Sequence, residues 1–538
     1  MDGSTARSAR ASTGSRWFWS LFALALLVFS GVYSYLAPFG IWVNQIFGQP
    51  AWYELDPGSF YVTTAHQLRW GEAPLWVGHP GAPLMLLLLG IQKAYYAVAS
   101  PEGLSFGGFT ARHLPTVYWL SKLAITMAHL ASFRALFCFA RQLAGSSAAA
   151  LFATLGYATS LPVLYYLSRI AVEPLMMLCF FTAFLATWRY EKLATQRRVG
   201  PAFVFAALAA IAAVTGAITK LNFLGPLPFF LGLYLLAAGR WSAAGDAIGS
   251  STRAGACAVF VAVGGALALF STQLIDWPRF LGFWDNIANA AHPPAHWPLT
   301  RLLPAATPSG VFLLSELAFA GLGVAGWVLW LRRHHGRRSR VLWVSAYAGY
   351  GLLLFAYRIA VGGGFGPFNY FALSNGVFAV FFGDLTARGL RRLSLPCTGW
   401  RGALLGLAWA GLLHAGGIFA VVDSRRHDAE IYARGRPLYD LIAGLGPSDR
   451  LGIDAAIAAL PTFRDRLFAV HAVPFRDWEV RVPPAELQTA FEALFTPVDP
   501  KTLAADARWL NVPKLGTRIV VLQGSEQPRE SPDPQPRR

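Results

Sequence analysis

The sequence predicts a mainly helical membrane protein that crosses the bilayer about eleven times and carries a small α/β domain at its C-terminal end. Of its 538 residues, 55% are hydrophobic, and the mean hydropathy is +0.43. Many apolar runs approach the roughly 20 residues that a helix needs to cross the hydrocarbon core. After Val422 the apolar runs give way to short strand-like and helix-like segments, which predict a separate domain.

The first span is expected at residues 17–38, after a basic tail of residues 1–16. No convincing small-residue cleavage site accompanies it, so we interpret it as an anchor helix. Residues 83–99 form a short apolar run that begins at Pro83 and ends near the Tyr95-Tyr96 pair, which suits a helix lying in the membrane interface. The further spans are expected at residues 115–138, 148–167, 171–188, 201–218, 221–239, 255–275, 309–331, 342–361, 367–386 and 403–422.

Loop charges predict the orientation of the chain. If the N-terminus is cytoplasmic and residues 83–99 do not cross, the positive-inside rule is obeyed by the basic loops 189–200, 240–254, 332–341 and 387–402. If residues 83–99 crossed, all of these loops would face outward. We therefore expect a multi-pass protein of the cell membrane, the inner membrane in a bacterium, with an extracytoplasmic C-terminus. The net charge of +17 follows from these loops and does not indicate a nucleic-acid partner.

The C-terminal domain is expected to span residues 423–523, and the tail of residues 524–538, rich in Pro, Glu and Arg, is expected to be disordered. Helices are predicted at 425–445 and 483–495, and strands at 450–454, 465–471 and 517–523. The transmembrane domain then covers residues 17–422. The four cysteines have no metal-ligand spacing and indicate neither a disulfide framework nor a zinc site.

Ionisable residues concentrate in the loop of residues 39–114, which follows the first span. It contains Glu54, Asp56, His66 and His79 in a protein with only 14% charged residues, and such groups beside a membrane helix indicate contact with water, a headgroup or a substrate. The predicted topology places further polar segments on the same side, at 168–170, near Lys220, at 276–308 and at 362–366. A single outward-facing site assembled from several loops follows from this topology.

Asp56 is the first candidate catalytic residue, because a carboxylate beyond the outer end of a helix can accept a proton from a hydroxyl nucleophile. The alternative is a structural Asx turn at Asp-Pro-Gly. Glu54, two residues earlier, is the competing base.

The run from Asp56 to Gly71, followed by His79-Pro-Gly-Ala-Pro and an apolar helix, resembles the first outer loop of the GT-C glycosyltransferases. This group includes the protein O-mannosyltransferases and the lipid A aminoarabinose transferases. The resemblance implies the GT-C fold, Asp56 as the base, His79 in the substrate site and an interfacial helix at 83–99. The sequence departs from the family pattern in having Asp56-Pro57 where an Asp-Glu pair is usual.

Two further segments resemble elements of the same family. SRIAVEPL at 168–175 resembles its Arg…Asp-Pro-Leu element, in which Arg169 would bind the donor phosphate and Glu173 would contact substrate. The two residues are four apart, so on a helix they would share a face, and a structural ion pair between them is the alternative. TGAITKLNFLGP at 215–226 resembles a segment with a basic residue in an outer turn, where Lys220 would stabilise a polyprenyl-phosphate leaving group. The alternative for Lys220 is a snorkelling interfacial lysine.

Residues 276–308 contain several tryptophans and His292, which indicate either an interfacial aromatic belt or a lid that covers the sugar. Arg358, and Asn369 with Tyr370, are further candidates for phosphate or substrate contact. The histidines lack a third ligand at suitable spacing, so no metal or other cofactor is predicted.

The resemblance implies an inverting transferase that moves a sugar from a polyprenyl-phosphate donor to an acceptor hydroxyl on an unidentified glycan, lipid or protein. The donor would enter from the membrane lipid. Two alternatives remain open: a polytopic lipid or sugar transporter or flippase, which would place ionisable groups near mid-membrane, and a non-catalytic subunit of cell-envelope polysaccharide assembly.

Overall fold

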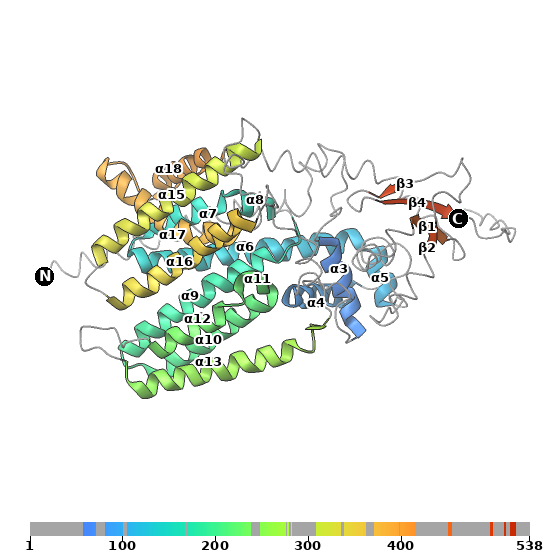
Figure 1. The fold of residues 1–538 in the computed structure, drawn as a ribbon, viewed down its shortest axis with the longest axis horizontal. Helices are drawn as coiled ribbons and strands as arrows, with labels where there is room; N and C mark the ends of the chain where they lie inside the picture. Colours follow the sequence, from blue (N-terminus) through green and yellow to red (C-terminus); the bar gives the residue numbers. More distant parts are fainter. Residues whose placement is uncertain are drawn as a thin grey trace.

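The computed structural model describes residues 58–70, 81–99, 105–166, 169–237, 248–275, 277–278, 281, 308–334, 338–361, 371–397, 399–415, 450–454, 495–498, 510–512 and 517–522. Figure 1 shows a bundle of long helices with short helices and a small sheet toward one end. The elements near that end include α3 (Gly58–Gln67), η1 (Leu68–Trp70), α5 (Phe106–Arg112) and the longer helix α4 (Ala82–Ala99).

The bundle consists of helices that coincide with the predicted spans. They are α6 (Leu114–Ala144), α7 (Ser147–Ala158), α8 (Leu161–Tyr166), α9 (Glu173–Thr195), α10 (Val199–Thr219), α11 (Leu221–Leu224), α12 (Leu227–Ala237), α13 (Ser250–Ser271), α15 (Pro308–His334), α16 (Arg338–Val361), α17 (Phe371–Arg392) and α18 (Gly399–Leu413).

Local sequence explains where several helices begin and end. Gly145 ends α6 in a left-handed conformation with φ of 65°, and the Ser146 hydroxyl then caps α7 by accepting a hydrogen bond of 3.3 Å from the Ala149 amide. Two predicted spans are interrupted. Residues 148–167 form α7 and α8 with a break at Thr159-Ser160, and residues 221–239 contain α11 and α12, separated near Pro226, whose missing amide hydrogen cannot continue a helical ladder.

Close contacts fix the directions of the helices. A Cβ atom on Gly216, near the end of α10, would lie 3.1 Å from Cβ of Cys179, near the start of α9, so these two helices are antiparallel. Gly376, near the start of α17, lies against Met177, near the start of α9. Along α17, Asn375 contacts Glu316 and the later Asp384 contacts the later Arg333, so α15 and α17 run parallel. The ends of α9, α15 and α17 therefore share one end of the bundle with the start of α10.

Basic residues collect at that end. Those in the described helix ends and turns include Lys192, Arg197, Arg198, Arg332, Arg333, Arg391 and Arg392. The prediction that loops 189–200, 332–341 and 387–402 lie on one side agrees with this arrangement. Which side of the membrane this is remains a prediction.

Five of the described helices are long and apolar enough to cross a membrane, judged by length and composition: α4, α6, α10, α13 and α15. Shorter apolar helices occur at Ser147–Ala158, Leu227–Leu236, Val344–Ala356 and Arg401–Leu413. The helical membrane class is confirmed at this level, and the count of eleven spans remains a prediction, as does the anchor at 17–38, which lies outside the described residues.

The helix α4 lies beyond the ends of α10 and α13. Its first residue, Ala82, packs with Ile218 at the end of α10, with Leu221 at the start of α11 and with Ile275, which follows α13. Along its length α4 packs against α3 and the start of α6 through Leu84, Leu88 and Val117. This position fits the predicted interfacial helix, although its length and composition also suit a span.

The C-terminal region contains a four-stranded sheet in the order β2-β1-β4-β3. Its strands are β1 (Arg450–Asp454), β2 (Phe495–Val498), β3 (Leu510–Val512) and β4 (Thr517–Leu522). β1 pairs in parallel with β2 and antiparallel with β4. The strands predicted at 450–454 and 517–523 are confirmed. β2 and β3 were not predicted, and Phe495, predicted as the last residue of a helix, instead begins β2. The remaining segments predicted for this domain lie outside the described residues.

Candidate active site

The strongest candidate site is a buried ion pair where α9 and α11 begin. The Lys220 ammonium group donates a hydrogen bond to Oε1 of the Glu173 carboxylate. Only 3% of the lysine side chain and 5% of the glutamate side chain are exposed. A buried pair of opposite charges needs each partner to offset the cost of removing the other from water. The two residues are 47 positions apart in the chain and are brought together by the antiparallel packing of α9 and α10.

Local structure explains the placement of both side chains. Glu173 is the first residue of α9 and is followed by Pro174, which is favoured in the first helical turn, where a negative charge also interacts well with the helix dipole. Lys220 joins α10 to α11 with an extended backbone, φ of −151° and ψ of 86°, and its amide donates to the Gly216 carbonyl at 3.0 Å. The predicted short turn around Lys220 is therefore present.

Arg169 lies in the connection that precedes α9. Its amide donates to the Tyr166 carbonyl at 3.1 Å, and the residue is 4% exposed. The prediction that Arg169 and Glu173 share one face of a helix is wrong, because α9 begins only at Glu173. Glu173 pairs with Lys220, a contact that was not predicted. The expected alternative of an ion pair between Arg169 and Glu173 stays a prediction.

The helices α3 and α4 form a wall against this junction. Tyr61 in the first turn of α3 packs in one cluster with Ile170 and Val172, which flank the connection before α9. A Cβ atom on Gly81 would lie 2.6 Å from Cε1 of Tyr61 and 3.4 Å from Cγ1 of Val172, and Gly81 has φ of +44°, so glycine is required at this contact. The start of α3 is therefore held beside Glu173.

A buried hydrogen-bond network ties the other end of α3 to α4. Nδ1 of His66 lies 3.1 Å from Oε1 of Gln92, and Nε2 of Gln92 donates to the Val62 carbonyl at 3.1 Å. The His66 ring stacks on Phe106 of α5, with 5.0 Å between ring centroids. Because His66 and Gln92 are fully or almost fully buried, these contacts fix the orientation of α3. His66 therefore has a structural partner in the described part of the chain.

Most of the other predicted site residues lie outside the described residues: Glu54, Asp56, His79, His292, Asn369 and Tyr370. Asp56 precedes Gly58, the first residue of α3, by two positions, and Asn369 and Tyr370 directly precede α17. Arg358 lies in the last turn of α16, near the end where Phe355 contacts Phe371 at the start of α17. Their roles remain predictions.

Among the residues that the structure describes, no group of three or more His, Cys, Asp or Glu side chains could hold a metal ion. Several candidate ligands lie outside that part of the chain, so the expectation that no metal is required remains a prediction.

A second buried polar pair was not predicted. Nδ2 of Asn375 in α17 donates to Oε2 of Glu316 in α15 at 2.5 Å, and both residues are completely buried. An acidic residue eight positions inside an apolar run was the available signal, because such a residue needs a buried partner. The partner itself depends on how α15 and α17 pack, which local sequence does not reveal.

Comparison with known proteins gives one informative result. Neither a protein-family model nor a curated protein sequence matches the chain. The crystal structure of ArnT from Cupriavidus metallidurans bound to undecaprenyl phosphate matches with a TM-score of 0.54 and 13% sequence identity, covering 93% of this chain and 98% of ArnT. At this identity the similarity shows the fold alone: the chain has an ArnT-like fold, in agreement with the fold expected from the sequence.

Proposed function

We propose that the protein is an inverting glycosyltransferase that moves a sugar from a polyprenyl-phosphate donor to an acceptor hydroxyl. The observation that carries this proposal is the buried Lys220–Glu173 pair beside α3, in a chain that has the fold of ArnT. The solved ArnT structure contains undecaprenyl phosphate, which supports a lipid phosphate as the ligand of the buried basic groups of this chain.

Lys220 and Arg169 are the proposed phosphate ligands, with Arg358 as a third. Both Lys220 and Arg169 are buried and belong to neighbouring connections at one end of the bundle. A guanidinium group and an ammonium group in a site of low dielectric stabilise the negative charge that develops on a leaving phosphate. No metal ion is needed to supply this charge.

Asp56 is the proposed general base, with Glu54 as the competing candidate. In the proposed reaction, a carboxylate oxygen of Asp56 takes the proton of the acceptor hydroxyl while the hydroxyl oxygen attacks the anomeric carbon. The bond from the anomeric carbon to the phosphate oxygen breaks, and polyprenyl phosphate leaves with the electron pair, so the configuration is inverted. The position of α3 supports this role because its first turn packs against the Glu173 junction. His79, His292, Asn369 and Tyr370 are proposed to contact the sugar or the acceptor.

Glu173 has a proposed role in the charge of the phosphate site. The donor is a phosphodiester with one negative charge, whereas the lipid product is a phosphomonoester with about −1.5 to −2 charges at neutral pH, as for other phosphomonoesters. The Glu173 carboxylate already offsets the charge of Lys220. The net charge of the pair therefore suits the singly charged donor phosphate better than the more highly charged product phosphate. This arrangement favours release of the lipid phosphate.

The site is proposed to face the extracytoplasmic side. It lies opposite the end of the bundle where the basic ends of α9, α15 and α17 collect. Donor lipid would then enter laterally from the outer leaflet. A polytopic transporter is the second candidate, and the buried Glu316–Asn375 pair favours it, because transporters place ionisable groups inside the bundle.

A deletion strain provides the first test. We expect the lipid-linked sugar used by the enzyme to accumulate in its membranes, which mass spectrometry of extracted lipids would detect. When the deletion strain expresses the Asp56→Asn variant, we expect the lipid to remain accumulated, because sugar transfer is reduced by about 100- to 10,000-fold. When it expresses the Glu54→Gln variant, we expect the lipid to return to its normal level. Full clearance by a normally expressed Asp56→Asn variant would contradict the assignment of the base.

A further inference from the structure

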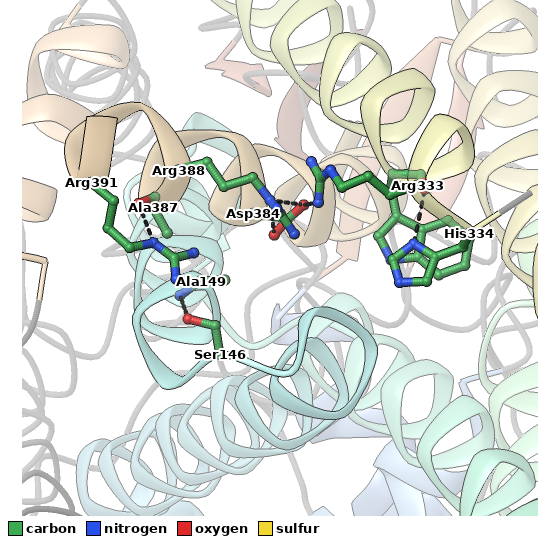
Figure 2. A network of polar contacts seen from close by, with 9 residues as sticks. Ser146, Ala149, Arg333, His334, Asp384, Ala387, Arg388 and Arg391 are labelled. Atoms are coloured by element: carbon green, nitrogen blue, oxygen red, sulfur yellow. Dashed lines mark hydrogen bonds and ion pairs between the residues drawn. The ribbon is translucent and has the colours of Figure 1, made fainter. Parts of the chain in front are cut away.

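A second charged network lies at the opposite end of the bundle from Lys220. Asp384 in α17 is 2% exposed and accepts hydrogen bonds on both carboxylate oxygens. Nε of Arg388 donates at 2.8 and 3.0 Å, and Nη1 of Arg333 in α15 donates to Oδ2 at 3.3 Å. Figure 2 shows the two guanidinium groups converging on this carboxylate. One buried acid thus fixes two arginines from different helices.

The positive charge at this place exceeds what Asp384 neutralises. The last turns of α15 and α17 also carry Arg332, Arg391 and Arg392. We call these three arginines, together with Arg333 and Arg388, the α15–α17 basic cluster. The Nε group of Arg391 donates to the Ala387 carbonyl at 3.1 Å. Asp384 pairs with two members of the cluster, Arg333 and Arg388.

The arginines that bond Asp384 keep donors available for a further anion. About a third of each side chain is exposed, 32% for Arg333 and 34% for Arg388. A guanidinium group has five N–H donors in a fixed planar arrangement that matches the oxygens of a phosphate. Among the described residues, Arg388 contacts Asp384 through its Nε group.

Exposed leucines lie next to the cluster. Leu393, directly after Arg392, is 70% exposed, and Leu395, two positions later, is 42% exposed. Ser394 between them has φ of 56°, which turns the chain after α17. Apolar side chains beside arginines suit a molecule with an anionic head and a hydrocarbon tail, which a free phosphate ion lacks.

We propose that the α15–α17 basic cluster binds the headgroup of an anionic phospholipid in the leaflet opposite the candidate active site. The buried Asp384 orients Arg333 and Arg388 for the phosphate, Arg391 and Arg392 add charge, and Leu393 and Leu395 contact the acyl region. This site is separate from the proposed donor site and uses a different lipid. A simple topology signal would require the charge alone and no fixed arrangement.

The test compares two double variants of the full-length protein in nanodiscs. Arg391→Gln with Arg392→Gln removes two charges without breaking the bonds to Asp384. Arg197→Gln with Arg198→Gln removes the same charge from exposed residues at the same end of the bundle and serves as the matched control. Binding of phosphatidylglycerol is measured by native mass spectrometry and by thermal stability, with phosphatidylcholine as the neutral reference.

We expect the apparent affinity for phosphatidylglycerol to fall about tenfold in the first variant, as for the loss of charge-assisted hydrogen bonds, and by less than twofold in the control. Equal losses in the two variants, or no loss in either, would overturn the proposal in favour of diffuse attraction. Stabilisation by inorganic phosphate alone to the same extent as by the lipid would also overturn it. Arg388→Lys, which keeps the charge near Asp384 but removes the planar donors, should weaken lipid binding in protein that elutes as a single folded species.

Discussion

Lys220 and Glu173 depend on each other for the stability of their buried charges. Replacement of one partner leaves the other charge buried without compensation, which costs about 3–5 kcal/mol in measured buried pairs, whereas replacement of both removes the problem. The structure therefore separates two effects that a single substitution would combine: damage to the fold and loss of the proposed phosphate ligand.

We expect Lys220→Gln and Glu173→Gln each to lower the thermal stability of the purified protein, and the Lys220→Gln/Glu173→Gln double variant to recover most of that loss. Binding of undecaprenyl phosphate should be weak in Lys220→Gln and in the double variant despite the recovered stability. Thermal unfolding and lipid binding in the same detergent measure both quantities. Additive losses of stability in the double variant would show that the two side chains are not coupled.

At the scale of elements, the contacts between α3 and α4 fix the position of the helix that begins two residues after Asp56. Gln92 joins the two helices through its contacts with His66 and the Val62 carbonyl. Its loss removes two buried hydrogen bonds, each of which contributes about 0.5–1.5 kcal/mol.

Gln92→Leu is therefore expected to reduce sugar transfer while the protein remains in the membrane at normal levels, because α3 loses its fixed orientation and the bundle does not. Lys93→Gln is the matched control, since Lys93 is the neighbouring exposed residue of α4. Transfer assays with limited proteolysis of the α3 region would measure both effects. Wild-type activity of a stable Gln92→Leu protein would exclude this positioning role.

The contact between α15 and α17 is close enough to require glycine. A Cβ atom on Gly326 would lie 2.3 Å from the Phe381 carbonyl oxygen, whereas nothing lies within 4 Å of the corresponding position at Gly321. We expect Gly326→Ala to destabilise the protein by roughly 1–3 kcal/mol through separation of the two helices. Gly321→Ala should be neutral or slightly stabilising, because alanine favours the helix. Thermal unfolding of both variants provides the comparison.

For the whole molecule, the decisive property is that α4 and the arginine-rich helix ends lie at opposite ends of the bundle. In a background with the four native cysteines replaced by alanine, Ala97→Cys on α4 should react with a membrane-impermeant maleimide in intact cells. Gly200→Cys at the start of α10 should react only after permeabilisation. Both positions are exposed. Labelling of both from the same side would refute the predicted topology.

Much of the helical framework could be predicted because apolar runs of bilayer length have few alternatives to helices. The spans expected at 115–138, 171–188 and 201–218 correspond to α6, α9 and α10. The interruptions near Ser160 and Gly225 were less visible, because a break inside an apolar run changes the hydrogen bonds of the backbone and hardly changes the hydropathy. In the C-terminal sheet, β2 and β3 are too short to give a clear periodic pattern.

The candidate site could be predicted only as separate residues. Lys220, Arg169 and Glu173 were selected because they lie in segments that resemble elements of the GT-C glycosyltransferases. The contact between Glu173 and Lys220 was not predicted, since spacing within one segment pointed only to Arg169 as a partner of Glu173. The observed contact joins residues 47 positions apart, and such a contact depends on how two helices pack.

The sequence by itself determined that this chain is a helical membrane protein with its basic loops on one side, because the bilayer imposes length, hydropathy and charge asymmetry on every span separately. The tertiary structure alone decided which charged and polar groups meet: Lys220 with Glu173, Asn375 with Glu316, and Asp384 with two arginines. The physical reason is that a buried charge or polar group must find its partner across a helix interface. Local sequence fixes where that group lies along its own helix and leaves its partner to the packing.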